Sequence, residues 1–200
     1  MKIISFEGIE GVGKSTQIDL LNTYLISQGY RTEVFREPGS TITGEMIRDI
    51  LLNSPEELSY ESELLLMFAA RAQLINNKVS NSDIDFILFD RFYDASVAYQ
   101  GYGRGLSLDL IYDLISFTKC PKPLITFLLD ISVEEGFNRK IHDVKDRIES
   151  SGNEFFEKVR SGYLSIAQSD SERVKVLKAN ESIDVIHKNI LEHVQKILWI

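Results

Sequence analysis

The residues with the most distinctive chemistry lie near the start of the chain, between Gly8 and Ser15, where the sequence reads G-x-x-x-x-G-K-S. An apolar, β-prone run (residues 3–6) precedes them, and apolar residues at helical spacing (18, 21 and 25) follow. Strand, glycine-rich turn and helix N-terminus form a cradle whose backbone N–H groups bind phosphate. Lys14 would reach the β- and γ-phosphates of a nucleoside triphosphate, and the Ser15 hydroxyl would ligate Mg²⁺. The predicted triphosphate-binding residues are Gly8, Ile9, Glu10, Gly11, Val12, Gly13, Lys14, Ser15 and Thr16.

A second candidate pair, Asp90 and Arg91, follows the apolar run at residues 86–89. An apolar strand that ends in Asp is typical of the second P-loop motif, in which the carboxylate helps to hold Mg²⁺ directly or through water. Many ATP-driven machines carry an acid at the next position to activate water. Arg91 instead favours binding of a second phosphate. The alternative is a surface cation at a strand end.

Arg71 has only apolar neighbours three and four residues away, at positions 67, 68, 74 and 75 of a predicted helix. It therefore lies on a face that should be buried, and a buried guanidinium without a partner is very costly. Arg71 either pairs with an internal carboxylate or lines a pocket for a polar ligand. Phe68, one turn earlier, offers a ring for stacking on that ligand, or belongs to the core.

Three further segments are candidate ligand-binding or flexible regions. Pro38 and Gly39 predict a rigid loop, which is an ordinary turn or part of a ligand site at the carboxyl edge of a sheet. Three glycines in residues 101–105 predict a flexible loop. The basic segment with Arg139, Lys140, Lys145 and Arg147 is either a solvated connection, since acids are interleaved with the cations, or a lid over phosphates at about 139–150.

These residues must be positioned by alternating strands and helices, a pattern that predicts an α/β fold. We expect strands near 2–7, 32–35, 86–90, 124–130 and 173–178. We expect helices near 14–28, 43–53, 60–79, 94–100, 107–119, 133–141, 151–169 and 182–197. The fold class is a P-loop NTPase fold with three α/β/α layers, in which helices cover both faces of a five-stranded parallel sheet. One domain, residues 1–200, accounts for the whole chain.

Composition narrows the class of protein. A 44% hydrophobic content excludes a disordered chain, and the longest strictly apolar run, residues 64–70, is far shorter than the roughly 20 residues of a membrane span. The N-terminus does not resemble a secretory signal. A single cysteine, Cys120, suits a reducing compartment, so we expect a cytoplasmic protein. The net charge of −8 disfavours nucleic acid as a partner, whereas a small anion needs only a local positive pocket.

Taken together and in order, these motifs resemble the bacterial thymidylate kinases over essentially the whole chain. The resemblance rests on Phe6–Thr16, Arg36-Glu37-Pro38-Gly39, Phe68-Ala69-Ala70-Arg71, Asp90-Arg91, Ala98-Tyr99-Gln100-Gly101, Gly103-Arg104-Gly105 and Asp146-Arg147-Ile148-Glu149. It implies transfer of the γ-phosphoryl group of ATP to dTMP, with Mg²⁺ as cofactor, giving dTDP and ADP. It also implies a homodimer, to which the apolar helix at 60–79 could contribute.

The resemblance also implies roles for individual residues. Arg91 and Arg48 would hold the acceptor phosphate, and Arg71 would bind the thymine edge. Tyr99 would pack near the sugar and favour the 2′-deoxy form, and Glu10 would lie near the sugar and phosphate of dTMP. Further expected contacts with dTMP, most of them at the base, come from Glu37, Pro38, Met67, Phe68, Ser96 and Gln100. Mg²⁺ would be held by Ser15 and Asp90.

The lid resembles the bacterial type, in which a catalytic arginine lies in the lid rather than in the P-loop. Arg147 is the first candidate and Arg139 the second, beside Lys14, Arg91 and Glu10 at the catalytic centre. In the family the stacking aromatic lies four residues before the thymine-binding arginine. Here that position is Met67, and Phe68 lies three before, so either side chain could contact the base.

Two other classes of function compete with this interpretation. A kinase for a different nucleoside monophosphate would share the P-loop, although Arg71 and the Arg-Glu-Pro-Gly loop argue against it. A GTP-dependent switch would need an Asn-Lys-x-Asp guanine-binding motif, and the Asn77-Lys78 pair lacks the Asp.

Overall fold

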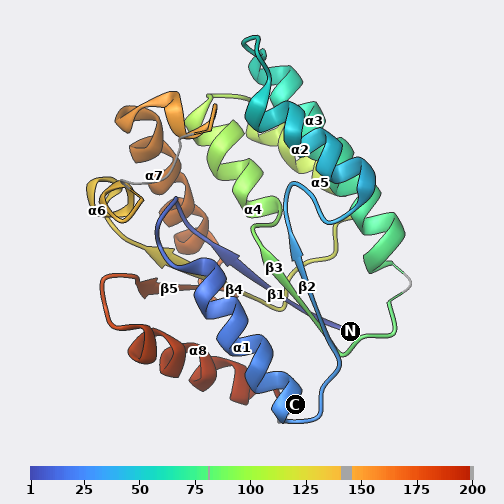
Figure 1. Ribbon diagram of the computed structural model, residues 1–200, viewed down its shortest axis with the longest axis vertical. Helices are drawn as coiled ribbons and strands as arrows, with labels where there is room; N and C mark the ends of the chain where they lie inside the picture. Colours follow the sequence, from blue (N-terminus) through green and yellow to red (C-terminus); the bar gives the residue numbers. More distant parts are fainter. Residues whose placement is uncertain (81, 141–145, 199–200) are drawn as a thin grey trace.

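Five parallel strands form the centre of the molecule in the computed structural model, which describes residues 1–80, 82–140 and 146–198 (Figure 1). The strands are β1 (Lys2–Glu7), β2 (Thr32–Arg36), β3 (Phe86–Asp90), β4 (Ile125–Asp130) and β5 (Val174–Lys178). Their order across the sheet is β2-β3-β1-β4-β5, and all neighbouring pairs are parallel. The predicted parallel sheet is confirmed, and the ends of each strand lie within one residue of the predicted ones.

Helices connect the strands, and each predicted helix has a counterpart. The α-helices are α1 (Lys14–Ser27), α2 (Ile42–Asn53), α3 (Tyr60–Leu74), α4 (Tyr93–Ser96), α5 (Leu108–Phe117), α6 (Val133–Asn138), α7 (Asn153–Ser169) and α8 (Ile183–Leu198). Two π-helical segments, η1 (Ile75–Val79) and η2 (Val97–Gly103), continue α3 and α4. A short 3-10 turn, η3 (Glu149–Ser151), precedes α7. The helix predicted at 133–141 is too long, because α6 ends at Asn138.

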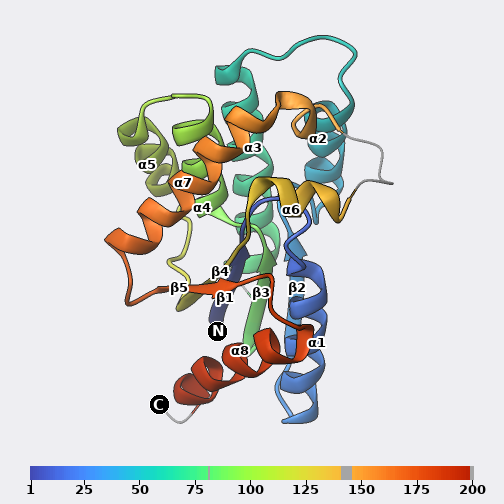
Figure 2. The same ribbon diagram turned by 90° about the vertical axis from the view of Figure 1, so that its left-hand side faces the viewer.

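Both faces of the sheet are covered, because successive side chains of a strand point to opposite faces. Ile4 of β1 belongs to one hydrophobic core together with Leu21 of α1 and Ile190 of α8. Ile3, its neighbour in sequence, belongs to a second core with Leu74 of α3. Figures 1 and 2 show α1 and α8 on one side of the sheet, and α3, α4, α5 and α7 on the other. The three-layer α/β/α arrangement is therefore confirmed.

The sheet order brings three functional loops to one edge. β1 and β2 both pair with β3, and both Phe6 and Arg36 lie opposite Asp90 in the register. The P-loop follows β1, the segment that begins at Glu37 follows β2, and Arg91 follows β3. Their carboxyl ends therefore meet at the same edge, which is where ligands bind in open α/β sheets.

The expected flexible loop at residues 101–105 is wrong for its first half, because η2 continues as a π-helix to Gly103. Its glycines allow close packing. A Cβ at Gly103 would lie 2.6 Å from the Phe155 ring of α7, and one at Gly101 would lie 2.5 Å from Leu108. The sequence pattern that indicates flexibility here serves packing of η2 against α5 and α7.

Part of the predicted lid can be described. Its first two residues follow α6, and its last part, from Asp146, leads into η3 and α7. Residues 141–145, including Lys145, lie outside the described residues, so the lid at about 139–150 stays a prediction. Among the helices of the described segments, none combines the length and the apolar character that a membrane span requires.

Candidate active site

A cavity of about 450 Å³ opens at the carboxyl edge of the sheet, between the P-loop, the loops after β2 and β3, and the two ends of the predicted lid. Its lining combines seven cationic side chains with five acidic ones. The cations are Lys14, Arg36, Arg48, Arg71, Arg91, Arg139 and Lys140. In a chain with a net charge of −8, this excess of cations makes the cavity a local site for anions.

The P-loop forms the floor of the cavity at the N-terminus of α1. Gly11 and Gly13 adopt positive φ angles of 73° and 89°, and residues 10–16 line the cavity. The Lys14 ammonium donates to the carbonyl oxygens of Gly8 (3.1 Å) and Ile9 (2.9 Å) beneath the loop. Gly8 and Ile9 do not line the cavity, and they contribute through this backbone contact. The helix N-terminus and Lys14 together favour phosphate groups.

Burial lowers the pKa of Lys14 to about 8, and the nearby charge of Arg91 acts in the same direction. The acids Asp90, Glu10 and Glu7 oppose this shift. Phosphate in the cavity would add negative charge beside the ammonium and would raise this pKa again.

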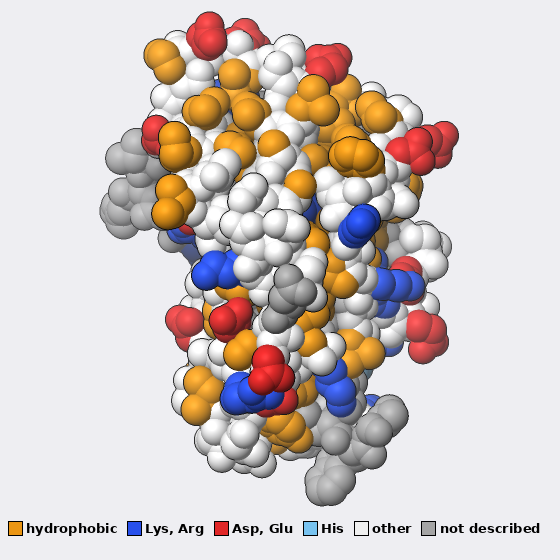
Figure 3. Space-filling model, turned by 90° about the vertical axis from the view of Figure 1, so that its right-hand side faces the viewer, with side chains coloured by type: hydrophobic (Ala, Val, Ile, Leu, Met, Phe, Trp, Pro, Cys, Tyr) orange, Lys and Arg blue, Asp and Glu red, His pale blue; other side chains and the backbone are white. Residues whose placement is uncertain are grey.

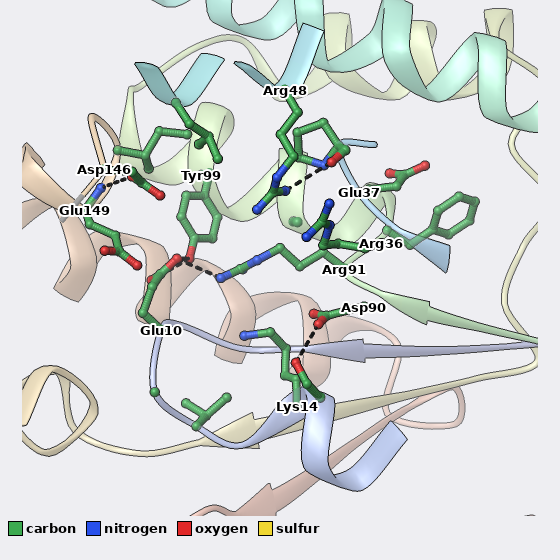
Figure 4. Close-up of a pocket in the computed structure, with 18 of the residues that line it drawn as sticks. Glu10, Lys14, Arg36, Glu37, Arg48, Asp90, Arg91, Tyr99, Asp146 and Glu149 are labelled. Carbon is green, nitrogen blue, oxygen red and sulfur yellow. Dashed lines mark hydrogen bonds and ion pairs between the residues drawn. The ribbon is translucent and has the colours of Figure 1, made fainter. Parts of the chain in front are cut away.

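A hydrogen bond joins the two predicted metal ligands. The Ser15 hydroxyl donates to Oδ2 of Asp90 at 3.0 Å, which places two oxygen ligands side by side next to Lys14 (Figure 4). Among the described residues, no three His, Cys, Asp or Glu side chains come together as a metal site of their own. This pair fits a Mg²⁺ ion that takes its other ligands from phosphates and water, as Mg²⁺ does in nucleotide sites.

Arg91 is held in place from several sides. Its guanidinium donates to Glu10 at 2.7 Å and to the carbonyl oxygen of Gly8 at 2.9 Å, and it lies over the Tyr99 ring at 4.9 Å. The Tyr99 hydroxyl also donates to Glu10, at 2.9 Å. The Arg91 backbone has a φ of +66°, a region that costs energy for a side chain of this size. The backbone conformation and these contacts hold the guanidinium of Arg91 in one place at the cavity wall.

Arg71 pairs with an internal carboxylate, as the first alternative predicted, and it also lines the cavity, so its role toward a polar ligand stays a prediction. Its Nε donates to Glu37 at 2.7 Å, and its other nitrogens donate to Ser96 Oγ at 3.0 Å and to the carbonyl oxygen of Phe92 at 3.2 Å. The side chain is only 3% exposed. These partners fix the plane of the guanidinium at one end of the cavity.

The loop after β2 and the helix α2 supply the upper wall. Arg48 of α2 donates to the carbonyl oxygen of Pro38 at 3.0 Å, which ties the helix to the loop. Arg36, which the sequence analysis did not select, also lines the cavity and pairs with Glu45 at 3.1 Å. Figure 4 shows the cationic ends of Lys14, Arg48 and Arg91 directed into the same space.

The structure distinguishes the two candidates for base stacking. Met67 lines the cavity, whereas Phe68 is buried in the core with 3% of its surface exposed. The Phe68 ring lies 4.7 Å from the guanidinium of Arg71 and supports it from behind. Ser96, Tyr99 and Gln100 line the cavity as expected from the motifs.

The two candidate lid arginines lie in different environments. Arg139 lines the cavity and donates to the carbonyl oxygens of Gly11 (3.4 Å) and Ala179 (3.0 Å). Arg147 does not line the cavity. Its guanidinium donates to Glu63 of α3 at 2.6 Å and to the carbonyl oxygen of Leu51 at 2.8 Å.

Two buried acids near the site were missed from the sequence. Glu7, at the end of β1, accepts from the backbone N–H of Phe92 at 2.7 Å and from the Tyr163 hydroxyl at 2.9 Å. Burial and the charge of Asp94 raise the pKa of Glu7 to about 8. Glu63 is fully buried on α3. For Glu7 the available signal was its place at the end of an apolar strand. Glu63 gave a weaker signal than Arg71, because Leu66 and Met67 lie on its apolar side but Ser59 is polar.

Comparison with known proteins gives one result throughout. The sequence profile of the family described as "Thymidylate kinase" matches residues 6–190. Thymidylate kinase from Prosthecochloris aestuarii is 44% identical over 94% of this chain and 91% of its own length. The enzyme from Thermosipho melanesiensis is 45% identical over 94% of each chain. The crystal structure of thymidylate kinase from Ehrlichia chaffeensis matches with a TM-score of 0.79 and 31% identity, over 97% of this chain and 98% of that chain.

Proposed function

Because the chain belongs to the thymidylate kinase family, we propose that this cavity transfers the γ-phosphoryl group of ATP to the 5′-phosphate of dTMP, which gives dTDP and ADP. The observation that carries the proposal is the composition of the cavity. One continuous space joins a P-loop to the fixed guanidinium of Arg91 and to the buried guanidinium of Arg71. These are a donor site, an anchor for a second phosphate and a hydrogen-bonding site for a base.

The donor half of the cavity would hold ATP. The backbone N–H groups of the P-loop and Lys14 bind its phosphates, and Arg139 approaches from the lid side. Ser15 and Asp90 would hold Mg²⁺, with phosphate oxygens and water as further ligands. When bound, the ion neutralises charge on the β- and γ-phosphates and orients them.

The acceptor half would hold dTMP between α3, η2 and the loop after β2. Arg91 and Arg48 would bind its phosphate. Arg71 and Ser96, which already share a hydrogen bond, would bind the polar edge of thymine. Met67, rather than Phe68, would contact the face of the base, because only Met67 lines the cavity. Pro38 and Gln100 complete the wall.

Tyr99 and Glu10 would lie beside the sugar. Burial keeps the pKa of Tyr99 well above its usual range, so the phenol stays protonated and donates to Glu10. This arrangement fills the space beside Arg91 and would disfavour an additional 2′-hydroxyl.

The reaction asks little covalent chemistry of the protein. An oxygen of the dTMP phosphate forms a bond to the γ-phosphorus, and the bond from that phosphorus to the bridging oxygen of ADP breaks. The attacking phosphate is already an anion, so no strong general base is needed. Lys14, Arg91 and Arg139 would neutralise the charge that spreads over the transferring group. Exclusion of water by the lid would limit wasteful hydrolysis of ATP.

The exposed side chains of the molecule bear on its oligomeric state. We propose a homodimer formed through α2 and α3, because their exposed faces carry Ile42, Met46, Ile50 and Leu65. Figure 3 looks onto this side of the molecule, where hydrophobic side chains gather in the upper half.

The negative net charge gives no support to a nucleic-acid partner. A cytoplasmic location would supply both nucleotides and suits the single cysteine.

The test is ADP release from Mg·ATP with a panel of acceptors: none, dTMP, dUMP, UMP, CMP, AMP, GMP and thymidine. We expect strong turnover with dTMP and near silence without an acceptor. Preference for AMP or GMP over dTMP, or equal turnover without any acceptor, would overturn the proposal. Thymidine serves as the control for the acceptor phosphate, since it keeps the base but gives Arg91 nothing to bind.

A further inference from the structure

The fully buried carboxylate of Glu63 accepts hydrogen bonds from three side chains that are distant in sequence. Gln100 donates to Oε1 at 2.9 Å, and Arg104 donates to both oxygens at 3.3 and 3.2 Å. Arg147 donates to Oε2 at 2.6 Å. We call these four residues the Glu63 cluster. It joins α3 to η2 and to the C-terminal part of the predicted lid.

Both ends of the Glu63 cluster reach the cavity wall. Gln100 lines the cavity directly, and Arg147 is flanked by Asp146 and Ile148, which also line it. The backbone N–H of Arg147 donates to the carbonyl oxygen of Leu52, another lining residue, at 3.2 Å. The segment from Asp146 therefore rests on α2 and α3 through Arg147.

Charge makes the Glu63 cluster rigid. Burial acts to raise the pKa of Glu63, but the hydrogen bonds from Gln100, Arg104 and Arg147 and the charge of Arg104 outweigh it and lower the pKa, so the carboxylate stays ionised. The guanidinium of Arg104 is further held over the Phe155 ring at 4.2 Å. A neutral residue at position 63 would leave two guanidinium groups beside each other without their counter-ion, which is a costly arrangement.

We propose that Glu63 is a positioning residue for phosphoryl transfer, which acts through Arg147 to fix the C-terminal part of the lid over the cavity. This inference rests on the proposed kinase function. Under this inference Arg147 anchors the lid, and Arg139 is the lid arginine that faces the phosphates. The competing assignment makes Arg147 the catalytic cation and the contact with Glu63 a resting place for it.

The experiment compares the kinetics of Glu63→Gln, Arg147→Met and the double variant with those of the wild type. We expect each single variant to lower kcat about 10- to 100-fold, as misplacement of a supporting group does. We expect KM for dTMP to change little in Arg147→Met, because Arg71, Arg91, Arg48 and Gln100 are untouched there. The double variant should be no worse than Glu63→Gln, since that change already removes the contact between Glu63 and Arg147. Arg147→Lys, which keeps the ion pair, should restore most of kcat.

Asp130→Asn is the matched control. Asp130 also holds a guanidinium through two oxygens, that of Arg160 at 2.7 and 2.9 Å, but it does not line the cavity. We expect the kcat of Asp130→Asn to match that of the wild type. Hydrogen exchange provides a second measurement: Glu63→Gln should accelerate exchange of the amides in residues 146–151 and leave the P-loop amides unchanged.

Three results would overturn the inference. An unchanged or raised kcat in Glu63→Gln, with a large loss in Arg147→Met, would make Arg147 the catalytic cation. Unchanged kcat in both variants would leave the Glu63 cluster without a role in turnover. Equal losses in Glu63→Gln and Asp130→Asn would indicate a general effect on folding. Should the folded wild type fail to phosphorylate dTMP, the proposed function fails, and the exchange of residues 146–151 still decides whether Glu63 fixes this segment.

Discussion

At the scale of single residues, burial makes the charge of Lys14 hard to keep, whereas the partners of Arg91 raise its pKa. Lys14 is buried beside Arg91, and Arg91 itself needs Glu10 and the Gly8 carbonyl to hold it. Glu10 offsets part of the cost of bringing these cations together, and phosphate anions in the cavity would offset more of it. The site is therefore expected to bind nucleotide and protons together.

We expect the dissociation constant for Mg·ATP to rise as the pH increases through about 8, the pKa of Lys14 in the free protein. Below this pH Lys14 is already protonated, and binding needs no proton. Above it, the phosphates bind tightly only after Lys14 regains a proton, so Kd increases by up to about tenfold per pH unit. Calorimetry in buffers of different ionisation enthalpy measures Kd and proton uptake together.

The Lys14→Arg variant is the control for this prediction, because its guanidinium does not lose a proton in this range. The Kd of this variant for Mg·ATP should be higher than that of the wild type, but it should not vary above pH 7.5. A wild-type Kd that is also constant up to pH 9.5, without proton uptake, would contradict the assignment of Lys14 as the titrating group.

At the scale of elements, the P-loop depends on close contact with α6. A Cβ at Gly11 would lie 2.1 Å from the carbonyl oxygen of Gly136, which is backbone and cannot move aside cheaply. The positive φ of Gly11 adds a second reason for glycine. The loop that binds phosphate is thus fixed by the helix that leads into the lid.

Gly11→Ala should therefore weaken ATP binding at least about tenfold and lower the free energy of unfolding by more than the roughly 1–2 kcal/mol that a left-handed alanine costs by itself. Gly29→Ala is the control. Gly29 also has a positive φ, of 86°, but a Cβ there would meet nothing within 4 Å. Urea unfolding and ATP titration of both variants measure these effects. Equal stability and equal ATP affinity in the two variants would contradict the role of the Gly11–Gly136 contact.

At the scale of the whole molecule, the exposed apolar faces of α2 and α3 are a feature that one chain leaves unexplained. Met46 is 65% exposed and Leu65 is 59% exposed. Contiguous apolar surface of this kind usually marks an interface. The same two helices carry Arg48 and Arg71 on their cavity-facing sides, so association of two chains would stiffen both acceptor sites.

We expect the wild type to sediment as a dimer and Met46→Asp to sediment as a monomer, because a buried, unpaired carboxylate opposes association. Ile26→Asp, at a site on α1 that is 56% exposed, should remain dimeric. Sedimentation velocity at micromolar concentration measures all three proteins. A monomeric wild type, or a Met46→Asp dimer as tight as the wild type, would exclude this interface.

The features that depend on local backbone chemistry could be read from the order of residues. The P-loop, the strand that ends in Asp90 and Arg91, and the order of strands and helices were all predictable, because glycine spacing, apolar runs and hydrophobic periodicity act over a few residues. Even the placement of Arg71 on a buried face followed from its neighbours alone. The family resemblance added the substrates, which no spacing could supply.

Tertiary structure alone decided which distant groups meet. That Arg71 pairs with Glu37, that Met67 rather than Phe68 faces the cavity, and that the glycines of η2 serve packing all depend on elements far apart in the chain. Arg147 is the clearest case: its position in a basic segment suggested a phosphate ligand, yet its guanidinium lies on Glu63, 84 residues away. A buried charge takes the partner that the fold brings within reach, and that partner is set by the packing of α3 rather than by the residues beside it.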